Sequence, residues 1–84
     1  MADKHPNTFR LIIASIEETK FDGAAASATF PGAAGVLTVL ANHEPLVTTL
    51  NKGTIVVRSP GETKEFPVEK GVLEYSGGRA VVLL

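Results

Sequence analysis

The residues of this sequence best suited to chemistry are His43 and Glu44, which lie between Asn42 and Pro45. Imidazole and carboxylate groups can act as general acid and base or bind a metal. Adjacent residues of an extended loop point apart, however, and a metal needs about three or four converging ligands. The other histidine, His5, belongs to an N-terminal segment that we expect to be flexible. We therefore expect a surface loop or a binding contact at this corner, with no catalytic residue and no metal site.

Lys52 offers a second kind of chemistry, because Asn51-Lys52-Gly53 has the composition of a hairpin tip. Small β domains carry lipoyl or biotinyl groups on such a lysine, and a carrier domain that uses Lys52 is our alternative function. The flanking residues do not match the short motif of those domains, which favours a solvent-exposed turn lysine. The remaining carboxylates and serines lie in or beside predicted turns, or outside any nucleophile motif, so we expect no cofactor and no enzyme active site.

Composition excludes several other functions. The net charge is −1 and no three basic residues cluster, so the cationic face that nucleic-acid binding needs is missing. The absence of cysteine excludes disulfides, thiolate nucleophiles and zinc–sulfur sites. No apolar run approaches the ~20 residues that span a bilayer, and the first residues lack the apolar core of a signal peptide. We expect a cytosolic protein that reaches a membrane only through a partner, without direct membrane insertion.

The 84 residues predict one domain over residues 1–84, with residues 1–8 as a flexible N-terminal segment. Turn signals recur every ~8–12 residues, a spacing that is typical of β-sandwiches and barrels and too short for helices. The segments between them are rich in β-branched and aromatic residues, and Pro67 limits its segment to an edge strand or a bulge. The fold class is therefore all-β, a small antiparallel β-sandwich or flattened barrel. The predicted turns are at Asp22-Gly23, Pro31-Gly32, residues 42–45, residues 51–53, Pro60-Gly61, Lys70-Gly71 and Gly77-Gly78.

The order and spacing of several short motifs resemble one known family from about Phe9 to Leu84. The sequence is similar to the N-terminal β-sandwich domain of the epsilon subunit of F-type ATP synthase, which is called delta in mitochondria. The family corner commonly reads Pro-Gly-His-x-Pro-Leu, and here Ala41-Asn42 replace its first two residues. Asn42 can adopt the left-handed conformation that a glycine would supply. The motifs are Phe21-Asp22-Gly23, the turn of residues 31–35, residues 43–46, residues 51–53 and the run of residues 66–74.

The resemblance implies a non-catalytic subunit of the central stalk, or rotor, which links the gamma subunit to the membrane c-ring and supports coupling of proton translocation to ATP synthesis. It implies a peripheral membrane protein on the cytoplasmic face of the bacterial inner membrane, or on the stromal side in a plastid. Longer family members add a C-terminal helical hairpin linked to inhibition of ATP hydrolysis, and we assign neither that activity nor ATP binding to this sequence. By family analogy, the residues that face the c-ring are Ala34, Gly35, Val36, Asn42, His43 and Glu44, and those that face the stalk are Ser15 and Thr54.

Overall fold

A computed structural model describes residues 7–84 of the protein. His5 and most of the N-terminal segment for which we expected flexibility lie outside these residues. Residues 7–84 contain strands, turns and loops but no helix, which confirms the all-β prediction. The nine strands are β1 Phe9–Ala14, β2 Thr19–Ala25, β3 Ser27–Gly32, β4 Gly35–Leu40, β5 Leu46–Leu50, β6 Gly53–Ser59, β7 Glu62–Val68, β8 Gly71–Ser76 and β9 Arg79–Leu83.

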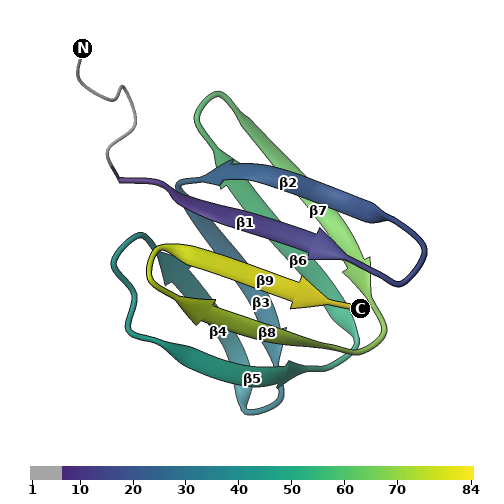
Figure 1. The fold of residues 1–84 in the computed structure, drawn as a ribbon. Coiled ribbons are helices and arrows are strands. Elements are labelled where there is room, and N and C mark those ends of the chain that lie inside the picture. Colours follow the sequence, from purple (N-terminus) through teal and green to yellow (C-terminus); the bar gives the residue numbers. More distant parts are fainter. Residues whose placement is uncertain (1–6) are drawn as a thin grey trace.

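The strands form one continuous sheet that folds over into two layers (Figure 1). The first layer has the order β2-β1-β9-β8-β5, and the second has the order β4-β3-β6-β7. The layers join where Leu50 of β5 pairs with Gly32 of β3. All pairs are antiparallel except β1 with β9, which run parallel from Arg10 to Ala14. The sandwich is therefore antiparallel, as predicted, apart from this one pairing between the first and last strands.

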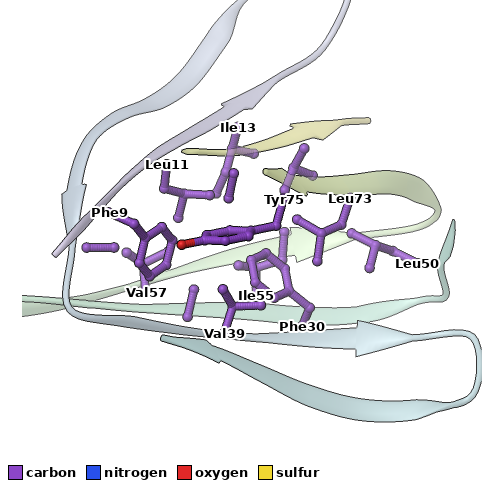
Figure 2. Packing of buried hydrophobic residues seen from close by; sticks show 14 of the residues in the cluster. Phe9, Leu11, Ile13, Phe30, Val39, Leu50, Ile55, Val57, Leu73 and Tyr75 are labelled. Atoms are coloured by element: carbon purple, nitrogen blue, oxygen red, sulfur yellow. The ribbon is translucent and has the colours of Figure 1, made fainter. Parts of the chain in front are cut away.

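The core lies between the two layers and is built from alternate positions of the strands. Figure 2 shows Tyr75 of β8 lying across this core, with its hydroxyl end toward Phe9. The Tyr75 and Phe9 rings meet edge to face, with centroids 5.7 Å apart. The Tyr75 hydroxyl is buried and has no hydrogen-bond partner among residues 7–84. The buried side chains are Phe9, Leu11, Ile13, Ala25, Ala28, Phe30, Val39, Leu50, Ile55, Val57, Val68, Leu73, Tyr75, Ala80 and Val82.

Two of the predicted turns are strands instead. Asp22-Gly23 lies within β2, where the Asp22 carboxylate accepts two hydrogen bonds from Arg10 of β1, at 2.9 and 3.0 Å. Pro31-Gly32 ends β3, and the turn itself is formed by residues 33–34. Proline is tolerated in β3 because the pairing with β6 stops at Thr29, so no neighbouring strand needs the missing N–H. Both errors came from treating Gly and Pro as turn residues where cross-strand contacts decide the conformation.

Other local predictions are confirmed. Asn42 adopts a positive φ of 69°, as expected for a residue that replaces a glycine. Pro67 lies in β7, which is an edge strand of the second layer.

The strands run back and forth between two ends of the sandwich. The Ser15 end, as we call it, carries the turns of residues 15–18, 33–34, 51–52 and 69–70. The His43 end carries residues 41–45, 60–61 and 77–78. A six-residue strand spans about 20 Å, so the two ends are separated by roughly that distance.

Candidate partner-binding surfaces

The turn between β3 and β4 presents Ala34, Gly35 and Val36 at the Ser15 end. Ala34 and Gly35 are exposed, and the Val36 side chain is 76% exposed. The N–H of Ala33 donates to the carbonyl of Thr49 at 3.0 Å, which fastens this turn to β5. The turn is thus a small, uncharged and well-anchored projection.

The two residues expected to face the stalk lie at the same end but on different layers. Ser15 follows β1, and its Oγ accepts hydrogen bonds from the N–H groups of Glu17 and Glu18 at 3.2 and 3.3 Å. Its own N–H donates to the Glu18 carbonyl at 2.8 Å. Ser15 therefore holds the β1–β2 turn together. Thr54 is exposed on the outer face of the second layer, opposite Pro67.

His43 is half-buried at the other end of the sandwich, against the core residue Tyr75. The two rings meet edge to face with centroids 5.8 Å apart. The N–H of His43 donates to the Leu40 carbonyl at 3.2 Å, and Nδ1 lies 2.7 Å from the Glu44 carbonyl. Because a carbonyl can only accept, Nδ1 carries the proton in this contact. His43 thus closes the corner, while Asn42 and Glu44 remain exposed.

The structure does not gather the six residues expected to face the c-ring into one patch. Ala34, Gly35 and Val36 lie at the Ser15 end, and Asn42, His43 and Glu44 lie at the His43 end. Strand β4 connects the two groups. Together, the turn of residues 33–34, β4 and the corner of residues 41–45 form one continuous side of the sandwich, which we call the β4 flank.

An apolar surface that the sequence analysis did not single out occupies part of the outer face of the first layer, where the exposed Glu74 lies between Val47 and Val81. Val47, Val72 and Leu83 are 70%, 40% and 58% exposed, and Val72 lies directly opposite Leu83. Ile12 and Val81 pair beside them and are half-buried. We call these five residues the outer apolar face. The signal was present in the sequence, since runs such as Ala80 to Leu84 place apolar side chains on both faces of a strand.

The shortest ion pair in the described part of the chain joins β1 and β2. Arg10 and Asp22 make a bidentate contact, and the side-chain hydrogen bond to Arg10 lowers the pKa of Asp22 below its usual value. The same contact raises the pKa of Arg10. This pair ties the edge strand β2 to the rest of its layer.

Several candidate chemistries find no assembled site in residues 7–84. This part of the chain holds no cluster of three or more His, Cys, Asp or Glu side chains placed to bind a metal. It also has no helix with the length and apolar character that crossing a bilayer requires. Lys52 is exposed in the turn between β5 and β6.

Comparison with known proteins gives a matching family model, similar curated proteins and solved structures of the same fold. The sequence model of the ATP synthase delta/epsilon chain β-sandwich domain matches residues 8–84. The ATP synthase epsilon chain of Bordetella petrii is 38% identical over 77 residues, covering 90% of this chain and 55% of that protein. The ATP synthase epsilon chain of Endomicrobium trichonymphae is 40% identical over 68 residues, covering 81% of this chain and 49% of that protein. The chain thus spans about half the length of these curated relatives.

Two solved structures share the fold. A chain of the Euglena gracilis mitochondrial ATP synthase, in an assembly of OSCP, F1 and the c-ring, superposes with a TM-score of 0.86 at 21% identity, covering 99% of this chain and 54% of that chain. A chain from the central stalk and c-ring of the Tetrahymena thermophila mitochondrial ATP synthase gives a TM-score of 0.74 at 15% identity, covering 88% of this chain and 60% of that chain. From its match over residues 8–84, the chain belongs to the ATP synthase delta/epsilon chain β-sandwich domain family.

Proposed function

We propose that this chain is the β-sandwich part of a non-catalytic central-stalk subunit of an F-type ATP synthase, and that it links the gamma subunit to the c-ring. The observation that carries the proposal is the family match over residues 8–84, which spans every strand of the sandwich. A rotor adaptor transmits torque between two bodies, and this requires a stiff body with two surfaces. Cross-strand hydrogen bonds and a close-packed core supply that stiffness.

The gamma subunit binds, in this proposal, to the outer apolar face and to the Ser15 end beside it. Exposed apolar patches on a small protein are typical of protein interfaces. Val72 and Leu83 lie directly opposite each other on this face, toward the Ser15 end, where a partner could exclude water from both. Ser15 borders the face at the end of β1, and Thr54 extends the contact around the same end.

The c-ring loops bind along the β4 flank. The six residues expected to face the ring then contact it over a length of about 20 Å, with Ala34, Gly35 and Val36 at one end and Asn42, His43 and Glu44 at the other. Within this group, His43 acts mainly by fixing the corner, because its ring and its Nδ1 already have partners. Asn42 and Glu44 supply the polar contacts to the ring.

The subunit makes no catalytic contribution of its own and needs no cofactor in this proposal. It is a peripheral membrane protein on the cytoplasmic face of a bacterial inner membrane, or on the stromal side in a plastid. The family match favours this function over a lipoyl or biotinyl carrier that uses Lys52, which is supported by the exposed position of this lysine in a turn of a small β domain. The purified protein should have the intact mass of the unmodified chain. An added lipoyl or biotinyl mass would instead support the carrier function.

Co-purification tests the proposal directly. The tagged chain, expressed together with the gamma subunit of its own ATP synthase, should bring down gamma in a one-to-one complex. Leu83→Asp should weaken that complex at least tenfold, because it places a charge beside Val72 on the outer apolar face. Thr63→Asp on β7 is the matched control, since it introduces the same charge at an exposed position of the other layer. Absence of gamma from the complex with the unaltered chain would overturn the proposal.

Because the sequence contains no cysteine, a single introduced cysteine is the one thiol of this sequence that a crosslinker can modify. The single variants Ala34→Cys and Asn42→Cys are each labelled with a short crosslinker and assembled into the synthase. Both should form crosslinks to the c-ring. A crosslink to the ring from one of them and to gamma from the other would show that the β4 flank points along the stalk rather than lying against the ring.

A further inference from the structure

The edge strand β4 differs from the edge strands β2 and β7 in carrying no residue that prevents pairing with another chain. Strand β4 pairs only with β3, so its second side is free of strand partners within residues 7–84. Its sequence, Gly35 to Leu40, is uncharged and apolar apart from Thr38. Edge strands of monomeric proteins normally carry charges or proline that block the addition of a strand.

The edge strands β2 and β7 do carry such residues. Strand β7 holds Glu62, Lys64 and Glu65, and Pro67 removes one backbone donor. Strand β2 holds Lys20 and Asp22. Compared with β2 and β7, the unprotected edge of β4 is an exception that needs an explanation.

The register of β3 and β4 shows which backbone groups of β4 are free. Gly32 and Gly35 flank the two-residue turn and form a hydrogen-bonded pair, and such pairs alternate along an antiparallel ladder. Pro31 is opposite Val36, and its carbonyl accepts from Asn51 on the side away from β4, at 2.8 Å. The pairs Pro31–Val36, Thr29–Thr38 and Ser27–Leu40 are therefore the non-bonded ones. Consequently, the N–H and C=O groups of Val36, Thr38 and Leu40 point outward from the sheet.

We propose that β4 pairs with β4 of a second copy of this chain, antiparallel and with Thr38 on the two-fold axis. In this register Thr38 faces its own copy, and Val36 faces Leu40 of the partner. All three residues have their backbone groups directed outward, so each of these pairs can exchange two N–H···O bonds. The Leu40 carbonyl, which already accepts from His43 at 3.2 Å, has a second lone pair for this purpose.

The side chains favour the same register. Val36 and Leu40 are 76% and 56% exposed on the outer face of β4, and the pairing sets them against each other across the axis. Facing the core, Leu37 meets Val39 of the partner, so apolar residues pair on both sides of the joined sheet. No charged residue of β4 is brought against a like charge. A second copy therefore satisfies every free group of this edge, which favours it over an unrelated partner.

The dimer uses the β4 flank and is thus incompatible with a partner bound along that flank. One strand pair buries less than a standard interface, so association is weak, with half-dimerisation at roughly 10 µM to 1 mM of chain. In the free chain, the pairing would cover the unpaired edge of β4. When the synthase assembles, the second copy would be replaced by the partner that binds the β4 flank. The dimer itself does not depend on the proposed function, since it follows from β4 alone.

Sedimentation equilibrium of the purified chain tests this inference. The weight-average mass should rise from 8.8 kDa toward twice that value over the stated concentration range. Thr38→Lys and Thr38→Glu should each weaken association at least tenfold, because like charges then meet on the axis. Mixing the two variants in equal amounts should restore it, because opposite charges then face each other. Thr19→Lys, which changes an exposed threonine on the edge strand β2, should associate like the unaltered chain.

Backbone amide shifts give a second readout that does not depend on the variants. The amides of Val36, Thr38 and Leu40 should shift and exchange more slowly as the concentration of the unaltered chain rises. A chain that stays monomeric up to about 1 mM overturns the inference. Association that survives both Thr38 variants, or that shifts the amides of the outer apolar face instead, also overturns it.

Discussion

Replacing Tyr75 by phenylalanine should stabilise this protein, although the change removes a polar group from a well-packed core. The Tyr75 side chain is 1% exposed, and its hydroxyl has no partner among residues 7–84. In the unfolded chain that hydroxyl bonds to water, and burying it without a partner costs about 1–3 kcal/mol. Tyr75→Phe removes this cost and keeps the edge-to-face contacts with Phe9 and His43.

We expect Tyr75→Phe to raise the free energy of unfolding by about 1 kcal/mol, near the lower end of that range, because the lost oxygen leaves a small gap. For a domain of this size, the midpoint of thermal unfolding should rise by roughly 4–8 °C. Urea unfolding followed by circular dichroism measures the difference, with an unchanged slope on denaturant. The control is Tyr75→Leu, which loses both ring contacts and should destabilise by about 2–3 kcal/mol. If Tyr75→Phe instead destabilises by 1 kcal/mol or more, the hydroxyl is bonded in solution and the reasoning fails.

Three further predictions concern backbone fit, pH and the ring contact. Gly32→Ala should lower the free energy of unfolding, measured in urea, by about 1–3 kcal/mol, because its Cβ would lie 2.8 Å from a backbone carbonyl oxygen. Gly23→Ala is the control and should be nearly neutral, since its Cβ would have no contact closer than 3.5 Å. Because the pKa of Asp22 is lowered, its ion pair with Arg10 contributes fully to stability above about pH 3.9 and is lost as the pH falls through the lowered pKa. Asp22→Asn should therefore abolish this part of the acid destabilisation. Thermal scans from pH 7 to 2 measure the difference. An identical loss of stability in acid for both proteins would refute that assignment. Ala34→Arg should leave the unfolding midpoint unchanged but weaken co-sedimentation with the c-ring about tenfold or more, and unchanged binding would place the ring elsewhere.

The sequence was sufficient for fold class because turn chemistry and β-branched segments alternate along it. Asn42 and Pro67 behave as their side chains predict, since a left-handed conformation and a missing N–H are local properties. Asp22 and Pro31 depart from the prediction because contacts with distant strands decide their conformation. The parallel pairing of β1 with β9 joins the two extremes of the described chain, and no local pattern signals it.

The candidate surfaces were less predictable than the fold. Residues 34–36 and 42–44 are close in sequence, and only the structure shows that β4 separates them by about 20 Å. His43 looked like the most reactive residue, yet its ring contacts Tyr75 and its Nδ1 contacts the Glu44 carbonyl. The outer apolar face depends on the register of β8 with β9, which places Val72 beside Leu83. Such surfaces arise from pairing across the sheet and leave only a weak signal in the sequence.

Native mass spectrometry of the chain mixed with the gamma subunit and the c-ring of its own synthase tests the adaptor function most directly. Our account predicts one ternary complex that contains a single copy of the chain, and its loss when the outer apolar face and the β4 flank carry charged substitutions together. A gamma–ring complex that forms without incorporating the chain, under conditions where the chain is folded, would contradict it.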